Sequence, residues 1–103
     1  MSYIIKSIDE LKELINNREY VDNLTIDFNK DINHLLRNLT DLTYLKFGED
    51  YDQITDLSTL SNLQHLVFGF SYNKKTDLSA LSNLQYLKFG YFYNHQCRNL
   101  NTM

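Results

Sequence analysis

Residues 57–73, LSTLSNLQHLVFGFSYN, and residues 78–94, LSALSNLQYLKFGYFYN, are near copies of each other at an offset of 21 residues. Residues 36–52, LRNLTDLTYLKFGEDYD, keep the same pattern one period earlier with more substitutions. A fixed period of this length indicates a repeat architecture, and we expect about four and a half units. Two apolar columns continue the period to the start of the chain: Tyr3, Leu24, Leu45, Leu66 and Leu87, and Ile5, Ile26, Phe47, Phe68 and Phe89.

Each unit contains one short strand signal. The pattern LxxLxF ends in alternating apolar and polar residues, which is typical of a strand with one buried face. Stacking the units places these strands side by side and in the same direction, with the Leu and Phe columns as a continuous core. The sequence therefore predicts an α/β fold with a parallel sheet. The expected strands lie near residues 3–6, 23–27, 43–47, 64–68 and 85–89.

The segment that leads from each strand back to the start of the next strand is called a return segment. The first two return segments are expected to be helical. Residues 7–15 are amphipathic, and Ser7 followed by Glu10 matches a capping box. Residues 31–39 have similar apolar spacing, with Asp31 as the expected cap.

The later returns differ from the early ones. Residues 55–62 and 76–83 carry apolar residues only at i and i+3, amid Ser, Thr and Asp. That spacing favours a short 3₁₀ or single-turn return. We expect Asp56 and Asp77 to cap these turns.

Three more columns follow each strand. Glycine in the first implies either a positive φ or the close approach of another backbone. Tyrosine in the second and a polar residue in the third predict a stacked aromatic column beside a polar turn column. The columns are Gly48, Gly69 and Gly90; Tyr51, Tyr72 and Tyr93; and Asp52, Asn73 and Asn94.

Composition limits the class of protein. The chain has 103 residues, 13 acidic and 10 basic, with a formal net charge of -3, which favours neither a second domain nor nucleic-acid binding. Cys97 is the single cysteine, which excludes an internal disulfide and favours a reducing compartment. The sequence has neither an apolar run of about 18 residues nor a signal-peptide pattern. We therefore expect a cytoplasmic protein with no membrane association.

The whole chain, residues 1–103, is expected to be a single domain. Its expected parts are an N-terminal cap with degenerate repeats at 1–35, clear repeats at 36–56, 57–77 and 78–98, and a tail at 99–103.

The repeats resemble leucine-rich repeats. LTYLKFG, LQHLVFG and LQYLKFG match the strand half of such repeats, and FGFSYN and FGYFYN are similar to the FNIP variant found in social amoebae and giant DNA viruses of amoebae. The chain departs from that pattern in having no proline and in carrying Asp50, Ser71 and Phe92 where an asparagine is usual. The resemblance implies a leucine-rich-repeat solenoid with its sheet on the concave side. If the chain is viral, the resemblance implies that the protein is located in the host cytoplasm.

The concave face is the candidate binding surface. Solenoids of this kind bind partners there, and exposed aromatic residues with flanking lysines suit a protein partner. The alternative is that these are ordinary solvated strand residues. The candidates form two columns: Tyr44, His65 and Tyr86, and Lys46, Val67 and Lys88.

The three histidines of the chain do not indicate a metal site. His34, His65 and His95 lie in different units and have no metal-ligand spacing, so we expect neither a metal nor a cofactor, and no enzyme activity. One alternative function is self-association through an open C-terminal edge, giving a homo-oligomer. Its expected contacts are Tyr91, Phe92 and Tyr93. The other, implied by the resemblance, is a fragment of a ubiquitin-ligase substrate adaptor that lacks an F-box.

Overall fold

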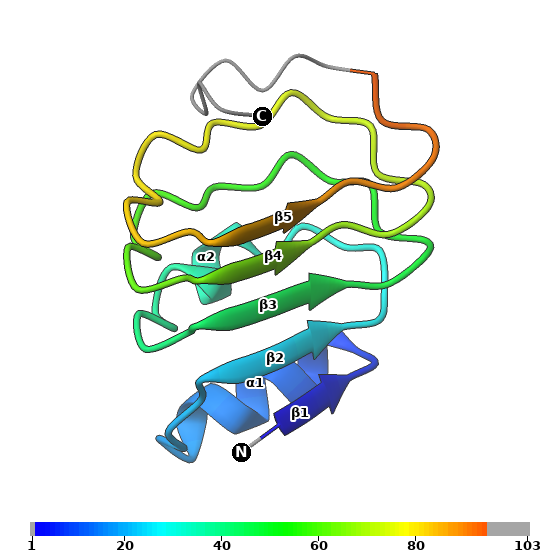
Figure 1. Ribbon diagram of the computed structural model, residues 1–103. Helices are drawn as coiled ribbons and strands as arrows, with labels where there is room; N and C mark the ends of the chain where they lie inside the picture. The colour runs from blue at the N-terminus through cyan, green and yellow to red at the C-terminus, as the bar shows by residue number, and fades with distance from the viewer. Residues whose placement is uncertain (1, 95–103) are drawn as a thin grey trace.

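The computed structural model describes residues 2–94, which form five parallel strands and two helices (Figure 1). In chain order the elements are β1 (Ser2–Ile5), α1 (Ile8–Asn16), β2 (Asn23–Ile26), α2 (Asn33–Leu36), β3 (Tyr44–Phe47), β4 (His65–Val67) and β5 (Tyr86–Lys88). The strands lie in the sheet in that same order, each beside its neighbour in sequence. All pairs are parallel, and the sheet is open rather than closed into a barrel. The expected strands are confirmed to within about a residue at each end.

The strand register follows the 21-residue period. Leu24 pairs with Leu45, Leu45 with Leu66, and Leu66 with Leu87. Because side chains alternate along a strand, an unbroken register keeps each column on one face of the sheet. The core therefore lies between the sheet and the return segments, with α1 and α2 on the same side of the sheet (Figure 1).

Helix α1 begins much as the sequence predicts. The Ser7 hydroxyl accepts a hydrogen bond from the backbone N–H of Glu10 at 3.2 Å. The Glu10 carboxylate, however, accepts from the backbone N–H of Lys6 rather than of Ser7, so the capping box is shifted by one residue. Leu11 and Leu14 are buried on the inner face of the helix.

The expected helix over 31–39 is wrong in length, because α2 is a single turn. Asp31 accepts a hydrogen bond from the Asn33 N–H at 3.0 Å, and Ile32 rather than Asp31 occupies the N-cap. The Asn33 side chain bridges to the next return, donating to the Ile54 carbonyl and accepting from the Asp56 N–H, each at 2.8 Å. The contacts between units thus define this segment more strongly than helix propensity does.

The later returns are single turns, as expected. Leu60 donates to the Leu57 carbonyl, and Leu63 donates in turn to that of Leu60. Asp56 and Asp77 cap these turns by accepting from the N–H groups of Ser58 and Ser79, both at 2.9 Å.

Two stacked aromatic columns run through the core, as the sequence predicts. Phe68 stacks between Phe47 and Phe89, with ring centroids 5.1 and 5.3 Å away and planes within 6° of parallel. Tyr72 stacks in the same way between Tyr51 and Tyr93, at 6.1 and 5.8 Å. The columns also contact each other within a unit, since the rings of Phe68 and Tyr72 are 3.9 Å apart. The largest side chains of the core are therefore aromatic rings that contact the neighbouring units.

A polar ladder accompanies the tyrosine column. The Asn73 N–H donates to the Asp52 carboxylate at 2.9 Å, and the Asn94 N–H donates to the Asn73 side-chain oxygen at 3.3 Å. On the return segments Asn62 and Asn83 donate to the carbonyls of Thr40 and Ser61. Part of the high asparagine content thus satisfies backbone groups from one unit to the next.

Close backbone approach, rather than positive φ, explains the glycine column. No glycine among the described residues has a positive φ. A Cβ atom on Gly69 would lie 2.2 Å from the Gly48 carbonyl oxygen, and one on Gly90 would lie equally close to that of Gly69. At Gly69 and Gly90 the backbones of successive units are packed so tightly that only hydrogen fits, whereas the nearest atom at Gly48 is the Asp27 side-chain oxygen.

The buried tyrosines make stability dependent on alkaline pH. Burial raises the pKa of Tyr51 to about 12 from the ordinary value of 10.0, although its hydrogen bond with Thr55 acts in the opposite direction. Burial raises the pKa of Tyr72 as well. Since the folded protein keeps a proton that the unfolded chain loses, stability is complete below about pH 10. It then falls as the pH rises toward about 12, by about 1 kcal/mol per pH unit for Tyr51.

We therefore expect Tyr51→Phe to flatten the pH dependence of unfolding. Urea titrations between about pH 9 and 11.5 should give a shallower loss of unfolding free energy for this variant than for the wild type. Tyr20→Phe is the control, because Tyr20 is 64% exposed. Equal slopes for the wild type and both variants would contradict this assignment.

Candidate functional site

The expected binding residues lie together on the face of the sheet that points away from the helices. Their strand neighbours Leu45, Leu66 and Leu87 point into the core. Parallel pairing aligns Tyr44 with His65 and His65 with Tyr86, and it aligns Lys46 with Val67 and Val67 with Lys88. All six expected residues therefore form one surface, which we call the sheet face: Tyr44, Lys46, His65, Val67, Tyr86 and Lys88.

The first row of the sheet face is a line of rings. The ring centroid of His65 lies 6.0 Å from that of Tyr44 and 5.6 Å from that of Tyr86. The ring planes are inclined by 32° and 27°. Cross-strand contact of this kind holds each ring in place, so little side-chain entropy remains to be lost when a partner binds.

The second row carries the positive charge. Lys46 and Lys88 are exposed on either side of the half-buried Val67. The same row continues through Thr25 to Ile4, which is 62% exposed. Ile4 is therefore an exposed apolar side chain on the same face of the sheet, separated from Val67 by Thr25 and Lys46. The period itself indicates this position, since Ile4 stands 21 residues before Thr25.

The expected edge contacts divide between two places. Tyr93 stacks on Tyr72 at 5.8 Å as part of the inner tyrosine column. Tyr91 and Phe92 instead lie on the surface with Phe70, a residue that the sequence reasoning did not single out. Phe70 is 50% exposed and stands one period before Tyr91, so the repeat pattern contains the signal for it. We call Phe70, Tyr91 and Phe92 the loop cluster.

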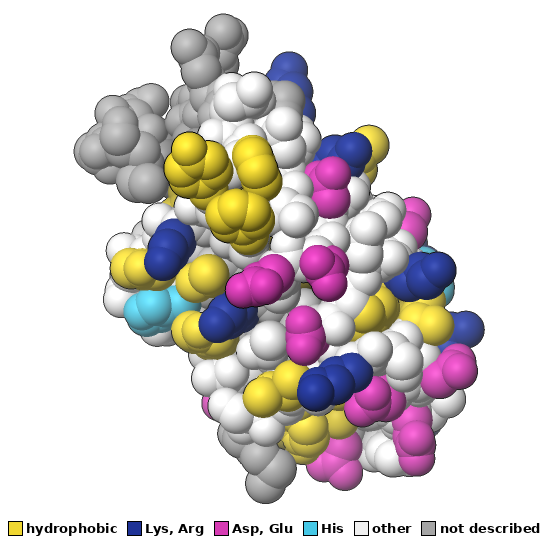
Figure 2. Space-filling model, turned by 90° about the vertical axis from the view of Figure 1, so that its right-hand side faces the viewer, with side chains coloured by type: hydrophobic (Ala, Val, Ile, Leu, Met, Phe, Trp, Pro, Cys, Tyr) yellow, Lys and Arg dark blue, Asp and Glu magenta, His cyan; other side chains and the backbone are white. Residues whose placement is uncertain are grey.

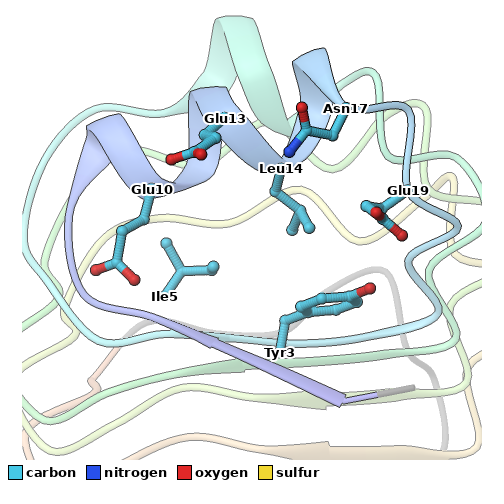
Figure 3. A pocket seen from close by; sticks show the side chains of 7 residues that line it. All are labelled: Tyr3, Ile5, Glu10, Glu13, Leu14, Asn17 and Glu19. Atoms are coloured by element: carbon cyan, nitrogen blue, oxygen red, sulfur yellow. The ribbon is translucent and has the colours of Figure 1, made fainter.

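A shallow hollow of about 290 Å³ lies between β1 and α1 (Figure 3). Ile5 and Leu14 form its apolar part, and three carboxylates surround it, those of Glu10, Glu13 and Glu19. The Tyr3 hydroxyl points toward Glu19, and partial burial together with that carboxylate raises the pKa of Tyr3.

The residues that the structure describes contain no cluster of side chains typical of a metal site. Within residues 2–94 no group of three His, Cys, Asp or Glu side chains is placed to hold a metal ion. His34 lies exposed on α2, on the other side of the sheet from the face that carries His65, and His95 and Cys97 lie outside the described residues. In the same part of the chain, no buried polar side chain lacks a hydrogen-bond partner.

Comparison with protein-family models, curated proteins and solved structures finds no match to this chain. Over residues 2–94, neither helix has the length and apolar character needed to cross a membrane.

Proposed function

We propose that the chain is a non-catalytic protein-interaction module that binds a protein partner through the sheet face. The observation that carries this proposal is the in-register row of Tyr44, His65 and Tyr86 beside the row of Lys46, Val67 and Lys88. Aromatic side chains dominate binding energy at protein interfaces, and ordered rings lose little entropy on association. The two lysines favour a partner that presents carboxylates beside apolar side chains.

We also propose that the fold is a leucine-rich-repeat solenoid of the FNIP-like kind, with the sheet face as its concave side. Three regularities support this: the 21-residue register, the stacked Phe and Tyr columns, and the ladder through Asp52, Asn73 and Asn94. Each unit contacts its neighbours through the same positions, as expected for a solenoid. An intracellular location is part of the same proposal.

Replacement of the ring row tests the function. We expect the triple variant Tyr44→Ser, His65→Ser and Tyr86→Ser to weaken binding to a protein captured from an extract of the expressing cells by at least about tenfold. These side chains lie on the surface, so circular dichroism and the urea midpoint should change only modestly.

The matched control removes three large exposed side chains elsewhere: Tyr20→Ser, His34→Ser and Ile54→Ser. This variant should bind as the wild type does. Binding that survives the ring-row variant, or that is lost equally in the control, would overturn the assignment of the sheet face.

A further inference from the structure

The loop cluster is a preformed aromatic surface in the loops that follow β4 and β5, and it shares no residue with the sheet face. Phe70 and Tyr91 stack with centroids 5.9 Å apart and planes inclined by 15°. Phe92 packs edge-on against both, at 4.8 Å from Phe70 and 5.4 Å from Tyr91. The three rings are nevertheless 50%, 82% and 54% exposed in the order Phe70, Tyr91, Phe92. Most exposed apolar residues stand alone, whereas these three touch one another in a single patch.

Two carboxylates border the loop cluster. Glu49 stands one period before Phe70, and the Ser71 N–H donates to the Glu49 carbonyl at 3.0 Å, so the two loops are in direct contact. Glu49 and Asp50 are both exposed. Figure 2 shows a group of hydrophobic side chains on the side where the strands end, with acidic side chains directly below it.

From this arrangement we infer that the loop cluster is a second docking surface, for a partner segment that presents an arginine or lysine beside an aliphatic side chain. An aliphatic side chain fits against the rings, where it loses its contact with water. A guanidinium or ammonium group can rest on a ring face and reach the neighbouring carboxylates. The sheet face carries the opposite charge, so the two surfaces select different partner segments.

Fluorescence anisotropy with short labelled peptides and the full chain tests this surface. The probe is a peptide of alternating leucine and arginine. Two comparison peptides replace arginine with glutamate or leucine with serine. We expect the leucine–arginine peptide to bind most tightly, and salt to weaken its binding.

Two variants connect the binding to the named residues. Phe70→Ser with Tyr91→Ser should weaken the leucine–arginine peptide by about tenfold, because it removes the ring faces. Glu49→Gln with Asp50→Asn leaves the rings intact and should weaken it by about threefold. The control Asp9→Asn with Glu13→Gln makes the same change of charge on α1 and should have no effect. The ring-row variant of the sheet face should also bind normally, so failure of either surface can be recognised separately.

Three results would overturn the inference. The first is no binding of the leucine–arginine peptide to the wild type. The second is equal binding by the wild type and both loop-cluster variants, checked for folding by circular dichroism. The third is a wild-type dimer in sedimentation equilibrium that the loop-cluster variants dissociate, since this would assign the patch to a second copy of the chain.

Discussion

Replacing Phe68 with alanine is expected to lower the free energy of unfolding by about 3–5 kcal/mol. The Phe68 ring is 1% exposed and stacks against Phe47, Tyr72 and Phe89. Its removal leaves a void inside the aromatic columns, with a strand on either side of β4 that limits collapse. Urea titration followed by circular dichroism measures the loss.

Phe89→Ala is the matched control for this substitution. Phe89 occupies the same column in the last described unit, but it is only partly buried. The same chemical change should therefore cost about half as much. An equal or larger cost at Phe89 would contradict the view that Phe68 stabilises the fold through its contacts with the units on both sides.

Gly69→Ala is the second large effect, expected to cost roughly 3 kcal/mol or more, or to prevent folding. The new methyl group would lie 2.2 Å from the carbonyl oxygen and 2.6 Å from the carbonyl carbon of Gly48. Both are backbone atoms that the strand pairing holds in place. The units must separate to admit it, and separation disrupts the stacked rings beside it.

Gly48→Ala provides the control in the same column. Its methyl group would meet the Asp27 carboxylate oxygen at 2.5 Å, which is the end of an exposed side chain that can turn away. The nearest backbone atom, the Asp27 Cα, would be 3.3 Å away, so only a small shift is needed there. We expect a cost of about 1 kcal/mol, and urea titration compares the two variants directly. If both glycines tolerate alanine equally, close packing does not explain the column.

The sequence predicts the repeated parts of the fold well, because the same residue pattern occurs in several units. Leu45, Leu66 and Leu87 establish a register that the strand pairing follows. The repeat also predicts the sheet face, since residues that alternate with buried leucines must point outward. The stacking of Tyr51 on Tyr72 follows from the same period.

Features that depend on one side chain or on exact distances were not predictable. Glycine at 69 was compatible with two explanations, and only the distance to the Gly48 carbonyl decides between them. α2 begins at Asn33, whose side chain bonds to a return segment 21 residues later. Helix propensity contains no information about such a contact.

The loop cluster shows a different limit. Tyr91, Phe92 and Tyr93 are adjacent in sequence, yet Tyr93 joins the inner column while the others join Phe70 on the surface. The position of each residue within the 21-residue repeat, rather than the number of aromatic residues nearby in the sequence, decides whether its ring lies in the core or on the surface. Phe70 is found only by comparing each loop residue with the one 21 positions away.

Site-specific photo-crosslinking tests the central claim, that the sheet face binds a protein partner, most directly. A photoreactive phenylalanine analogue is placed at Val67, in the middle of the sheet face, and in a separate protein at the exposed Ser61 on a return segment. Each is irradiated in an extract of the expressing cells. We predict a discrete protein adduct from position 67 and none from position 61. The absence of an adduct at 67, or the same adducts from both positions, would contradict the claim.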